Sequence, residues 1–333
     1  MIVLFKLSAI SRTKTVFHLR YTNSFIPSIM ASSSTPFHKY SKSAVGTETR
    51  GKTTENRLRR VDNFVTMYCC DLILSAEHLY VDLGYGRKPV TTLESARRFR
   101  QHNRQLRVLG IEIDNKRVRE AQKFVDDITD FRQGGFNLPL QANPSTGQRE
   151  SVNLIRAFNV LRQYDLESDC HDSHILMCNY LNINGILIEG TSDPLGRVWV
   201  ANVIRKQSDQ SLLIEALVFS TNFRDEFDIV TFQQNLPKNF IHRMTGKSEM
   251  IYNFFEDWKT SYEQVGKTMN SMFGAGIRQQ FITTAKYLAD EHGYDVITTK
   301  KYLKNGFLVW KLTPGSKGVD FDQISYRNLS SKK

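Results

Sequence analysis

Four residues between positions 82 and 112 have the types and spacing to bind a small charged ligand. The stretch VDLGYG places Asp82 two residues before a Gly-x-Gly pair, Gly84 and Gly86, and Glu112 follows 26 residues later. Glycine lets the backbone approach a bound molecule closely. Carboxylate oxygens accept hydrogen bonds from hydroxyl groups and attract a positive charge. The group therefore predicts a site for a ligand with hydroxyls and a cation.

A dinucleotide fits this loop poorly. In the dinucleotide fingerprint, a third small residue packs the following helix against the sheet, and the pyrophosphate lies at the helix N-terminus. Pro89 stands at that third position, and Arg87 and Lys88 crowd the loop. A nicotinamide oxidoreductase is therefore disfavoured.

The two acids indicate a different cofactor. Asp82, at the end of the first strand, suits an ammonium group better than a pyrophosphate. Glu112, at the end of the second strand, can accept hydrogen bonds from both hydroxyls of a ribose. The pair favours a ligand with a ribose and an ammonium but without phosphates. S-adenosylmethionine has this composition.

The strings VDLGYG and VLGIEID resemble the first two motifs of class I S-adenosylmethionine-dependent methyltransferases. The longer pattern also resembles uncharacterised bacterial members of this superfamily, and the resemblance covers residues 57–219. It implies methyl transfer to an unidentified acceptor, with Asp82 organising the loop and Glu112 binding the ribose. The cofactor-binding residues that it implies are Asp82, Gly84, Tyr85, Gly86, Glu112, Ile113, Phe136 and Asn159.

The more distant of these residues come from two later segments. In the resemblance, GGFNLPL lies near the adenine, so Phe136 is expected to cover the ring, and NLIRAFNVL places Asn159 beside cofactor and acceptor. The third glycine of the family is replaced by Lys88, and the acid of its third strand by Gly134 or Gly135. The alternative is therefore a non-catalytic protein of the same fold that binds RNA or an organellar assembly.

No residue is assigned as a catalyst. Methyl transfer is a displacement that needs alignment, and a general base only when the acceptor loses a proton. Tyr164, Asp165 and His242 have no spacing that marks such a base. We also predict no metal site, because Cys170, His174 and Cys178, spaced four apart on one helical face, lack an evident fourth ligand and are more typical of a buried face.

The elements that must position these residues alternate between strand and helix. This β-α-β-α order predicts a parallel sheet with right-handed crossovers. Thr91 and Glu94 form the pattern of a capping box at the start of the first helix, and Asp114 is expected to cap the second. The expected segments are strands 77–84 and 106–114 and helices 91–103 and 115–128.

Later segments add antiparallel strands and helices. Strands at 197–206 and 211–219 suit a hairpin, and Asn305-Gly306 between β-rich flanks predicts a second hairpin. The predicted fold class is α/β, a Rossmann-like class I methyltransferase sandwich whose mainly parallel sheet ends in an antiparallel hairpin, with a C-terminal α+β extension. The expected divisions are a targeting or disordered segment 1–47, a core 48–225, an extension 226–316 and a polar tail 317–333.

Charge and composition bear on location and partners. The formal net charge is +11, and residues 1–47 carry six Lys or Arg and no acid. This composition predicts a mitochondrial or plastid transit peptide, with a disordered tail as the alternative. Translation from Met30 would give a cytoplasmic form.

Two classes of partner are disfavoured. The basic run at 96–107 is more typical of a solvated helix face than of a nucleic-acid site, so a nucleic-acid partner is not favoured. No apolar run approaches the ~20 residues that span a bilayer. The oligomeric state stays open.

Overall fold

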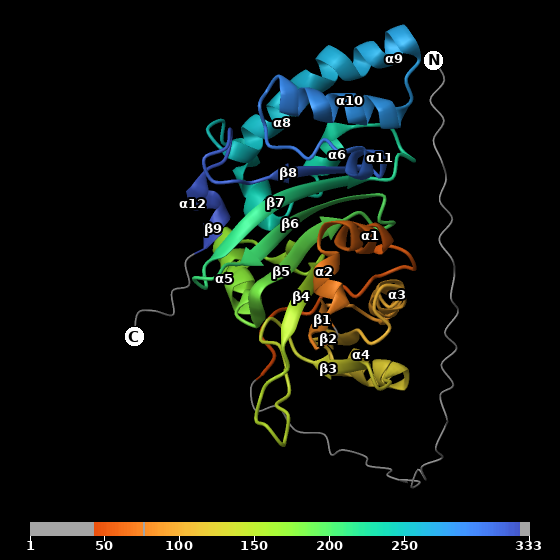
Figure 1. Ribbon diagram of the computed structural model, residues 1–333, viewed down its shortest axis with the longest axis vertical. Coiled ribbons are helices and arrows are strands. Elements are labelled where there is room, and N and C mark those ends of the chain that lie inside the picture. The colour runs from red at the N-terminus through yellow and green to blue at the C-terminus, as the bar shows by residue number, and fades with distance from the viewer. Residues whose placement is uncertain (1–42, 76, 327–333) are drawn as a thin grey trace, which may run out of the picture. The chain divides into compact units, whose positions relative to one another are not determined.

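The computed structural model describes residues 43–75 and 77–326, and these belong to one compact unit (Figure 1). The predicted transit peptide and Met30 lie outside the described residues, except for residues 43–47. Those five residues pack against the fold, so the folded unit begins before the expected boundary at residue 48.

A single mixed sheet forms the centre of the described chain. Its strand order is β3-β2-β1-β4-β5-β6-β7-β8, and β9 pairs with β7. The pairs from β3 to β5 are parallel, and those from β5 to β8 are antiparallel. The strands are β1 Leu79–Leu83, β2 Arg107–Glu112, β3 Thr129–Gln133, β4 Val152–Phe158, β5 Leu181–Ser192, β6 Val198–Lys206, β7 Leu212–Thr221, β8 Phe307–Lys311 and β9 Ser325–Tyr326.

The strand order reverses at β1, which has β2 on one side and β4 on the other. In register, Asp82 of β1 is opposite Gly110 of β2 and Arg156 of β4. Open α/β sheets bind ligands at such a reversal, beyond the carboxyl ends of the strands. The loop that carries Gly84 and Gly86 leaves β1 at this place.

Helices cover both faces of the sheet, and α8 to α10 lie beyond the β8 end in Figure 1. The α-helices are α1 Arg59–Tyr68, α2 Cys70–Leu74, α3 Val90–Phe99, α4 Asn115–Ala121, α5 Glu167–Cys178, α6 Ile229–Gln233, α7 Lys238–Ile241, α8 Met250–Ser261, α9 Lys267–Phe273, α10 Ile277–Asp290, α11 Lys300–Lys304 and α12 Phe321–Ile324. Shorter turns are η1 Gln122–Phe124, η2 Leu161–Gln163, η3 His242–Thr245 and the π-helical η4 Tyr262–Gly266. None of the described helices is long and apolar enough to cross a membrane.

Two large hydrophobic cores lie on opposite faces of the sheet. In one core, Phe64 of α1 and Phe99 of α3 pack on the face of the sheet that carries Tyr80 of β1. The other is aromatic: Phe254 of α8 stacks on Trp310 of β8, with ring centroids 4.1 Å apart, and on Phe219 of β7 at 5.4 Å. Stacked aromatic pairs add stability beyond the area they bury, so this cluster fixes the C-terminal helices to the antiparallel strands.

β8 shows how the C-terminal extension relates to the core. This strand belongs to the segment 226–316, yet it pairs with β7 of the segment 48–225. Both segments therefore build one sheet.

Two local predictions are wrong. The capping box is absent, because α3 begins at Val90 after Pro89; Thr91 lies inside the first turn and its hydroxyl faces Asp82. The hairpin at Asn305-Gly306 is absent, because the Lys-rich segment before it forms α11. Gly306 instead ends that helix with a φ of +72°, a role for which glycine is preferred.

The predicted cap of α4 is confirmed: Asp114 accepts from the Lys116 amide.

Candidate functional site

The glycine loop has the backbone conformation that glycine permits. Gly84 and Gly86 have φ angles of +76° and +81°. A Cβ at Gly84 would lie 2.7 Å from Cγ2 of Val160, which follows β4. The loop after β1 therefore lies directly against the end of β4, at the reversal of strand order.

Glu112 connects this loop to the next strand. Its buried carboxylate accepts from the Gly86 amide at 2.8 Å through Oε2. Its Oε1 accepts from the amides of Ile113 and Asp114 and from Arg117. Because each carboxylate oxygen offers about two lone pairs, Oε2 keeps one acceptor direction for a ligand.

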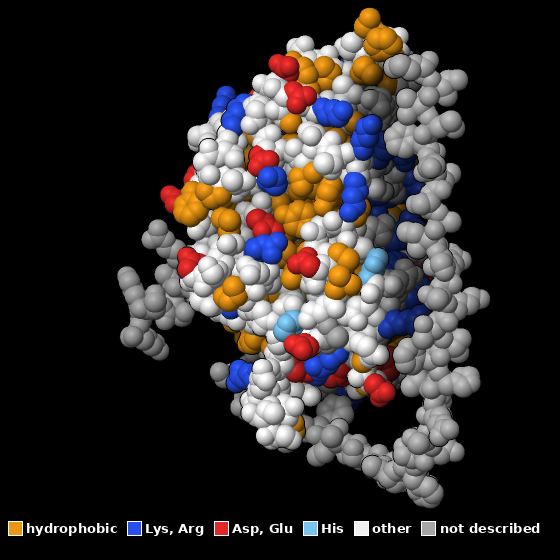
Figure 2. Space-filling view, viewed as in Figure 1, with side chains coloured by type: hydrophobic (Ala, Val, Ile, Leu, Met, Phe, Trp, Pro, Cys, Tyr) orange, Lys and Arg blue, Asp and Glu red, His pale blue; other side chains and the backbone are white. Residues whose placement is uncertain are grey.

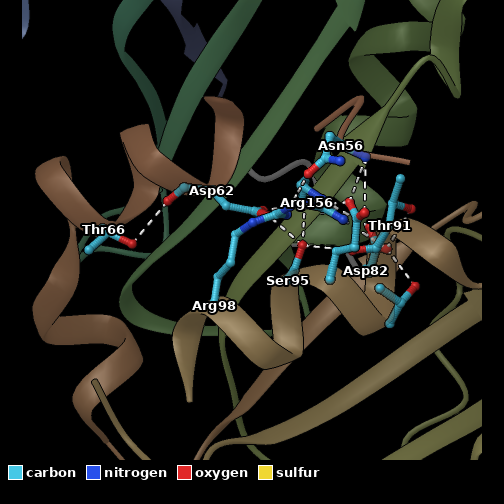
Figure 3. A network of polar contacts seen from close by, with 10 residues as sticks. Asn56, Asp62, Thr66, Asp82, Thr91, Ser95, Arg98 and Arg156 are labelled. Atoms are coloured by element: carbon cyan, nitrogen blue, oxygen red, sulfur yellow. Dashed lines mark hydrogen bonds and ion pairs between the residues drawn. The ribbon is translucent and has the colours of Figure 1, made fainter. Parts of the chain in front are cut away.

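The carboxylate of Asp82 is bound by side chains of the same chain. Its carboxylate accepts from Arg156 Nε at 3.0 Å and from the Thr92 hydroxyl at 2.6 Å, and it forms an ion pair with Arg156 Nη2 at 2.9 Å (Figure 3). We predicted from the sequence that Asp82 meets the ammonium of a ligand; the cation beside it is Arg156 of the protein itself. Asp82 therefore joins β1 to β4 and α3 beneath the glycine loop.

The same arginine holds a second carboxylate. Arg156 Nη1 lies 2.5 Å from Asp62 of α1, and Asp62 also accepts from Arg98 at 2.6 Å and from Ser95 at 2.8 Å. Burial alone would lower the pKa of Arg156, but Asp82, Tyr80 and Asp62 outweigh it and raise that pKa. We call Asp62, Asp82, Ser95, Arg98 and Arg156 the buried charge network.

An N-terminal strap, residues 43–52, crosses the edge of the sheet above the loop. Val45 accepts from the Phe136 amide at 2.8 Å, and Thr47 donates to the Tyr164 hydroxyl at 2.8 Å. Gly51 accepts from the Arg87 amide at 3.1 Å. The strap therefore spans from the segment after β3 to the glycine loop. Only the polar character of these residues was evident in the sequence, and no local signal marked them as part of the site.

A narrow hollow with a cavity volume of about 20 Å³, room for about one water molecule, lies between the strap and the sheet. Four of the predicted residues line it, namely Gly84, Glu112, Ile113 and Phe136. The lining residues that were not predicted include Val45, Gly46, Thr47 and Thr49 of the strap, together with Leu83, Ile111, Gly134, Gly135 and Val160.

The other predicted residues lie around the hollow rather than in its wall. Gly86 is covered by the strap, since a Cβ there would lie 3.1 Å from the Gly51 carbonyl. Tyr85 is buried against Phe131, with ring centroids 5.4 Å apart. Asn159, with a φ of +60°, bonds through its amide to Ser192 at the end of β5. Tyr85 and Asn159 therefore hold the loops that surround the hollow.

The residues present fit an adenosine-like group in chemistry. Glu112 keeps an acceptor direction for a ribose hydroxyl, and the Phe136 ring lines the hollow beside Gly134 and Gly135. A Cβ at Gly135 would lie 1.9 Å from the Val45 carbonyl, so the strap lies directly on this wall. A cofactor of this size requires the strap to shift outward.

The cysteines and histidine of α5 belong to the hydrophobic face of that helix. Cys170, His174 and Cys178 are buried, and His174 lies 3.4 Å from Glu189. Burial raises the pKa of the Cys170 thiol to about 12, with Glu189 as the next cause. In the part of the chain that the structure describes, no three such side chains are grouped to hold a metal ion.

Comparisons with known proteins concern the fold. No protein-family model and no curated protein matches the chain. The amino pentose methyltransferase CalS10 from Micromonospora echinaspora, solved with S-adenosylmethionine, is 15% identical with a TM-score of 0.31, over 51% of this chain and 70% of that one. The N-methyltransferase NodS from Bradyrhizobium japonicum WM9 is 14% identical with a TM-score of 0.30, over 41% and 68%.

The matched part spans less than two thirds of other solved methyltransferases, 41% of the StiE O-methyltransferase and 54% of one from Galdieria sulphuraria. Because these identities and TM-scores are low, the fold is assigned from the structure itself. The assignment rests on the strand order β3-β2-β1-β4-β5 and on the glycine loop after β1. The chain has a Rossmann-like α/β fold. The predicted α/β class, a mainly parallel Rossmann-like sheet that ends in antiparallel strands, is confirmed.

Proposed function

We propose that the protein transfers a methyl group from S-adenosylmethionine to an unidentified acceptor. The observation that carries the proposal is the bond from the Gly86 amide to Glu112, which places a glycine loop and an acid side by side where the strand order reverses. Bound there, the cofactor would supply an activated methyl group. The chain would supply alignment and exclusion of water.

Each part of the proposed site has a distinct task. Glu112 would hold a ribose hydroxyl through Oε2, and Phe136 would cover the adenine. Thr47 and Thr49 of the strap would close over the bound molecule and exclude water. Asp82 would act from beneath by fixing the loop, not by contact with the cofactor.

Calorimetry with S-adenosylmethionine and its demethylated product tests the proposal. We expect saturable binding, and Glu112→Gln should weaken it by about tenfold, because a hydrogen bond to a charged group contributes roughly 1.5–3 kcal/mol. Asp114→Asn is the matched control: it changes a neighbouring acid that caps α4 and does not line the hollow. Absence of binding to the folded wild-type protein contradicts the proposal and favours the non-catalytic alternative.

We also propose that the N-terminal segment directs the protein to a mitochondrion or plastid. The acid-poor, basic composition of residues 1–47 supports this proposal. A fluorescent fusion of residues 1–50 tests it by imaging. A diffuse cytosolic signal contradicts it.

A further inference from the structure

A second, larger hollow lies at the same edge of the sheet, beside the antiparallel strands. Its cavity volume is about 310 Å³, and it is open to solvent. We call it the arginine hollow, because its polar wall consists of Asn56, Arg59, Arg60, Arg197, Asn222 and Arg224. Figure 2 shows several Lys and Arg side chains along the right-hand side of the view, the side on which α1 begins and β7 ends in Figure 1.

Three elements bring these arginines together. Arg197 precedes β6 and Arg224 follows β7, and these two strand ends are adjacent because Val198 pairs with Thr221. Arg59 and Arg60 begin α1. The start of α1 is fixed against the turn before β6, since a Cβ at Gly196 would lie 1.8 Å from the carbonyl of residue 57. The cluster is therefore built from fixed backbone.

Within the described residues, the arginines of the hollow are poorly balanced by acids. Arg197 pairs with Asp225 at 2.8 Å, in a contact where both side chains are exposed. Arg60 contacts only neutral groups, namely the Ser220 hydroxyl and the carbonyls of Asn305 and Gly306, and it lies over the Phe307 ring. Among residues 43–75 and 77–326, Arg59 and Arg224 have no ion pair.

The surroundings of Arg60 are unfavourable to its positive charge. Burial first, and then the charges of Arg59 and Arg278, lower the pKa of Arg60 to about 10. The first turn of α1, a helix of 10 residues, adds the positive end of its dipole at the same place, and its N-cap residue Leu58 makes no side-chain capping bond. An anion would relieve this excess of positive charge.

We propose that the arginine hollow binds the phosphate group of a small phosphorylated molecule. Guanidinium groups donate two parallel hydrogen bonds to phosphate oxygens, and side-chain amides such as those of Asn56 and Asn222 add further donors. The volume of about 310 Å³ lies at the lower end of the range of small-molecule sites. Binding of single-stranded nucleic acid usually adds stacked aromatic rings, and the described wall of the hollow contains none.

This inference does not rest on the proposed methyl transfer. Between the two hollows, Arg57 donates to the Ser192 hydroxyl at 3.1 Å, and that hydroxyl also accepts from Asn159. These residues line neither hollow.

Calorimetry of the full chain with inorganic pyrophosphate, at constant ionic strength, tests the site. The double variant Arg59→Gln/Arg224→Gln removes two exposed guanidiniums from the hollow. Arg97→Gln/Arg119→Gln removes two exposed guanidiniums elsewhere and is the matched control. We expect saturable binding to the wild type, a loss of about tenfold or more in the first variant, and a change below about twofold in the control. Unfolding midpoints of both variants should equal that of the wild type.

Two outcomes overturn the inference, namely absence of saturable pyrophosphate binding and equal weakening in both double variants. If pyrophosphate does not bind, binding of a 12-nucleotide RNA with a steep salt dependence would assign the hollow to nucleic acid instead. Because S-adenosylmethionine is titrated separately, failure here is distinct from failure of the proposed methyl transfer.

Discussion

The regions around the two hollows at the carboxyl edge of the sheet differ in how far their charged side chains are paired. Beneath the glycine loop, the carboxylates of Asp62 and Asp82 are met by arginines of the same chain, and the strap covers what remains. In the arginine hollow, Arg59 and Arg224 have no acid from the described chain. The difference separates charge that holds the fold together from charge that is available to a ligand.

The largest effect should come from the buried charge network. Replacing Arg156 by Met leaves two buried carboxylates without their shared cation, and removal of one partner of a buried pair costs about 3–5 kcal/mol. Urea unfolding measures the change in the free energy of unfolding. Arg197→Gln is the control, because its exposed pair with Asp225 should contribute less than about 1 kcal/mol. Equal effects of the two substitutions would remove the distinction between the hollows.

A smaller effect is expected at the contact between strap and sheet. Gly135→Ala forces a Cβ to within 1.9 Å of the Val45 carbonyl, and overpacking of this kind costs about 1–3 kcal/mol. The strap should detach, so trypsin should cleave after Arg50 or Lys52 about tenfold faster. Gly276→Ala is the control, because a Cβ there meets nothing within 4 Å. An unchanged cleavage rate in Gly135→Ala would show that the strap does not rest on this wall.

A single hydrogen bond also tests the contact between the strap and the sheet. Tyr164→Phe removes the acceptor of the Thr47 amide, and a hydrogen bond of this kind contributes about 1 kcal/mol. Hydrogen exchange at the Thr47 amide should become about fivefold faster, while Tyr252→Phe should leave it unchanged. Equal rates in the wild type and Tyr164→Phe would contradict the contact.

The smallest effect should come from the arginine hollow itself. Arg224→Gln removes an exposed charge that has no ion pair among the described residues, so the free energy of unfolding should change by less than about 0.5 kcal/mol. Urea unfolding measures this change. A loss of unfolding free energy comparable to that of Arg156→Met would mean that Arg224 stabilises the fold and is not available to a ligand.

The sequence predicted the parts of the molecule that depend on local patterns. Alternating strands and helices, the glycine loop and the acid at Glu112 can be recognised from neighbouring residues, and the structure brings Gly86 and Glu112 together. The role of Asp82 could not be predicted, because its partner Arg156 is 74 residues away and arginine in a strand has no periodic signature. The strap was missed for the same reason, since polar coil carries no sign of where it packs.

The separation of Asp62 and Arg156 has a consequence for the order in which the chain folds. α1 leaves the ribosome early. Arg98, one of the two cations that pair with its buried carboxylate, follows 36 residues later, but the second, Arg156, is synthesised 94 residues later. Until β4 emerges, docking α1 would bury Asp62 with only one of its two counterions, which is less favourable than in the native network. We therefore expect α1 to dock fully only after β4 has formed, although domains fold broadly from the N-terminus during synthesis.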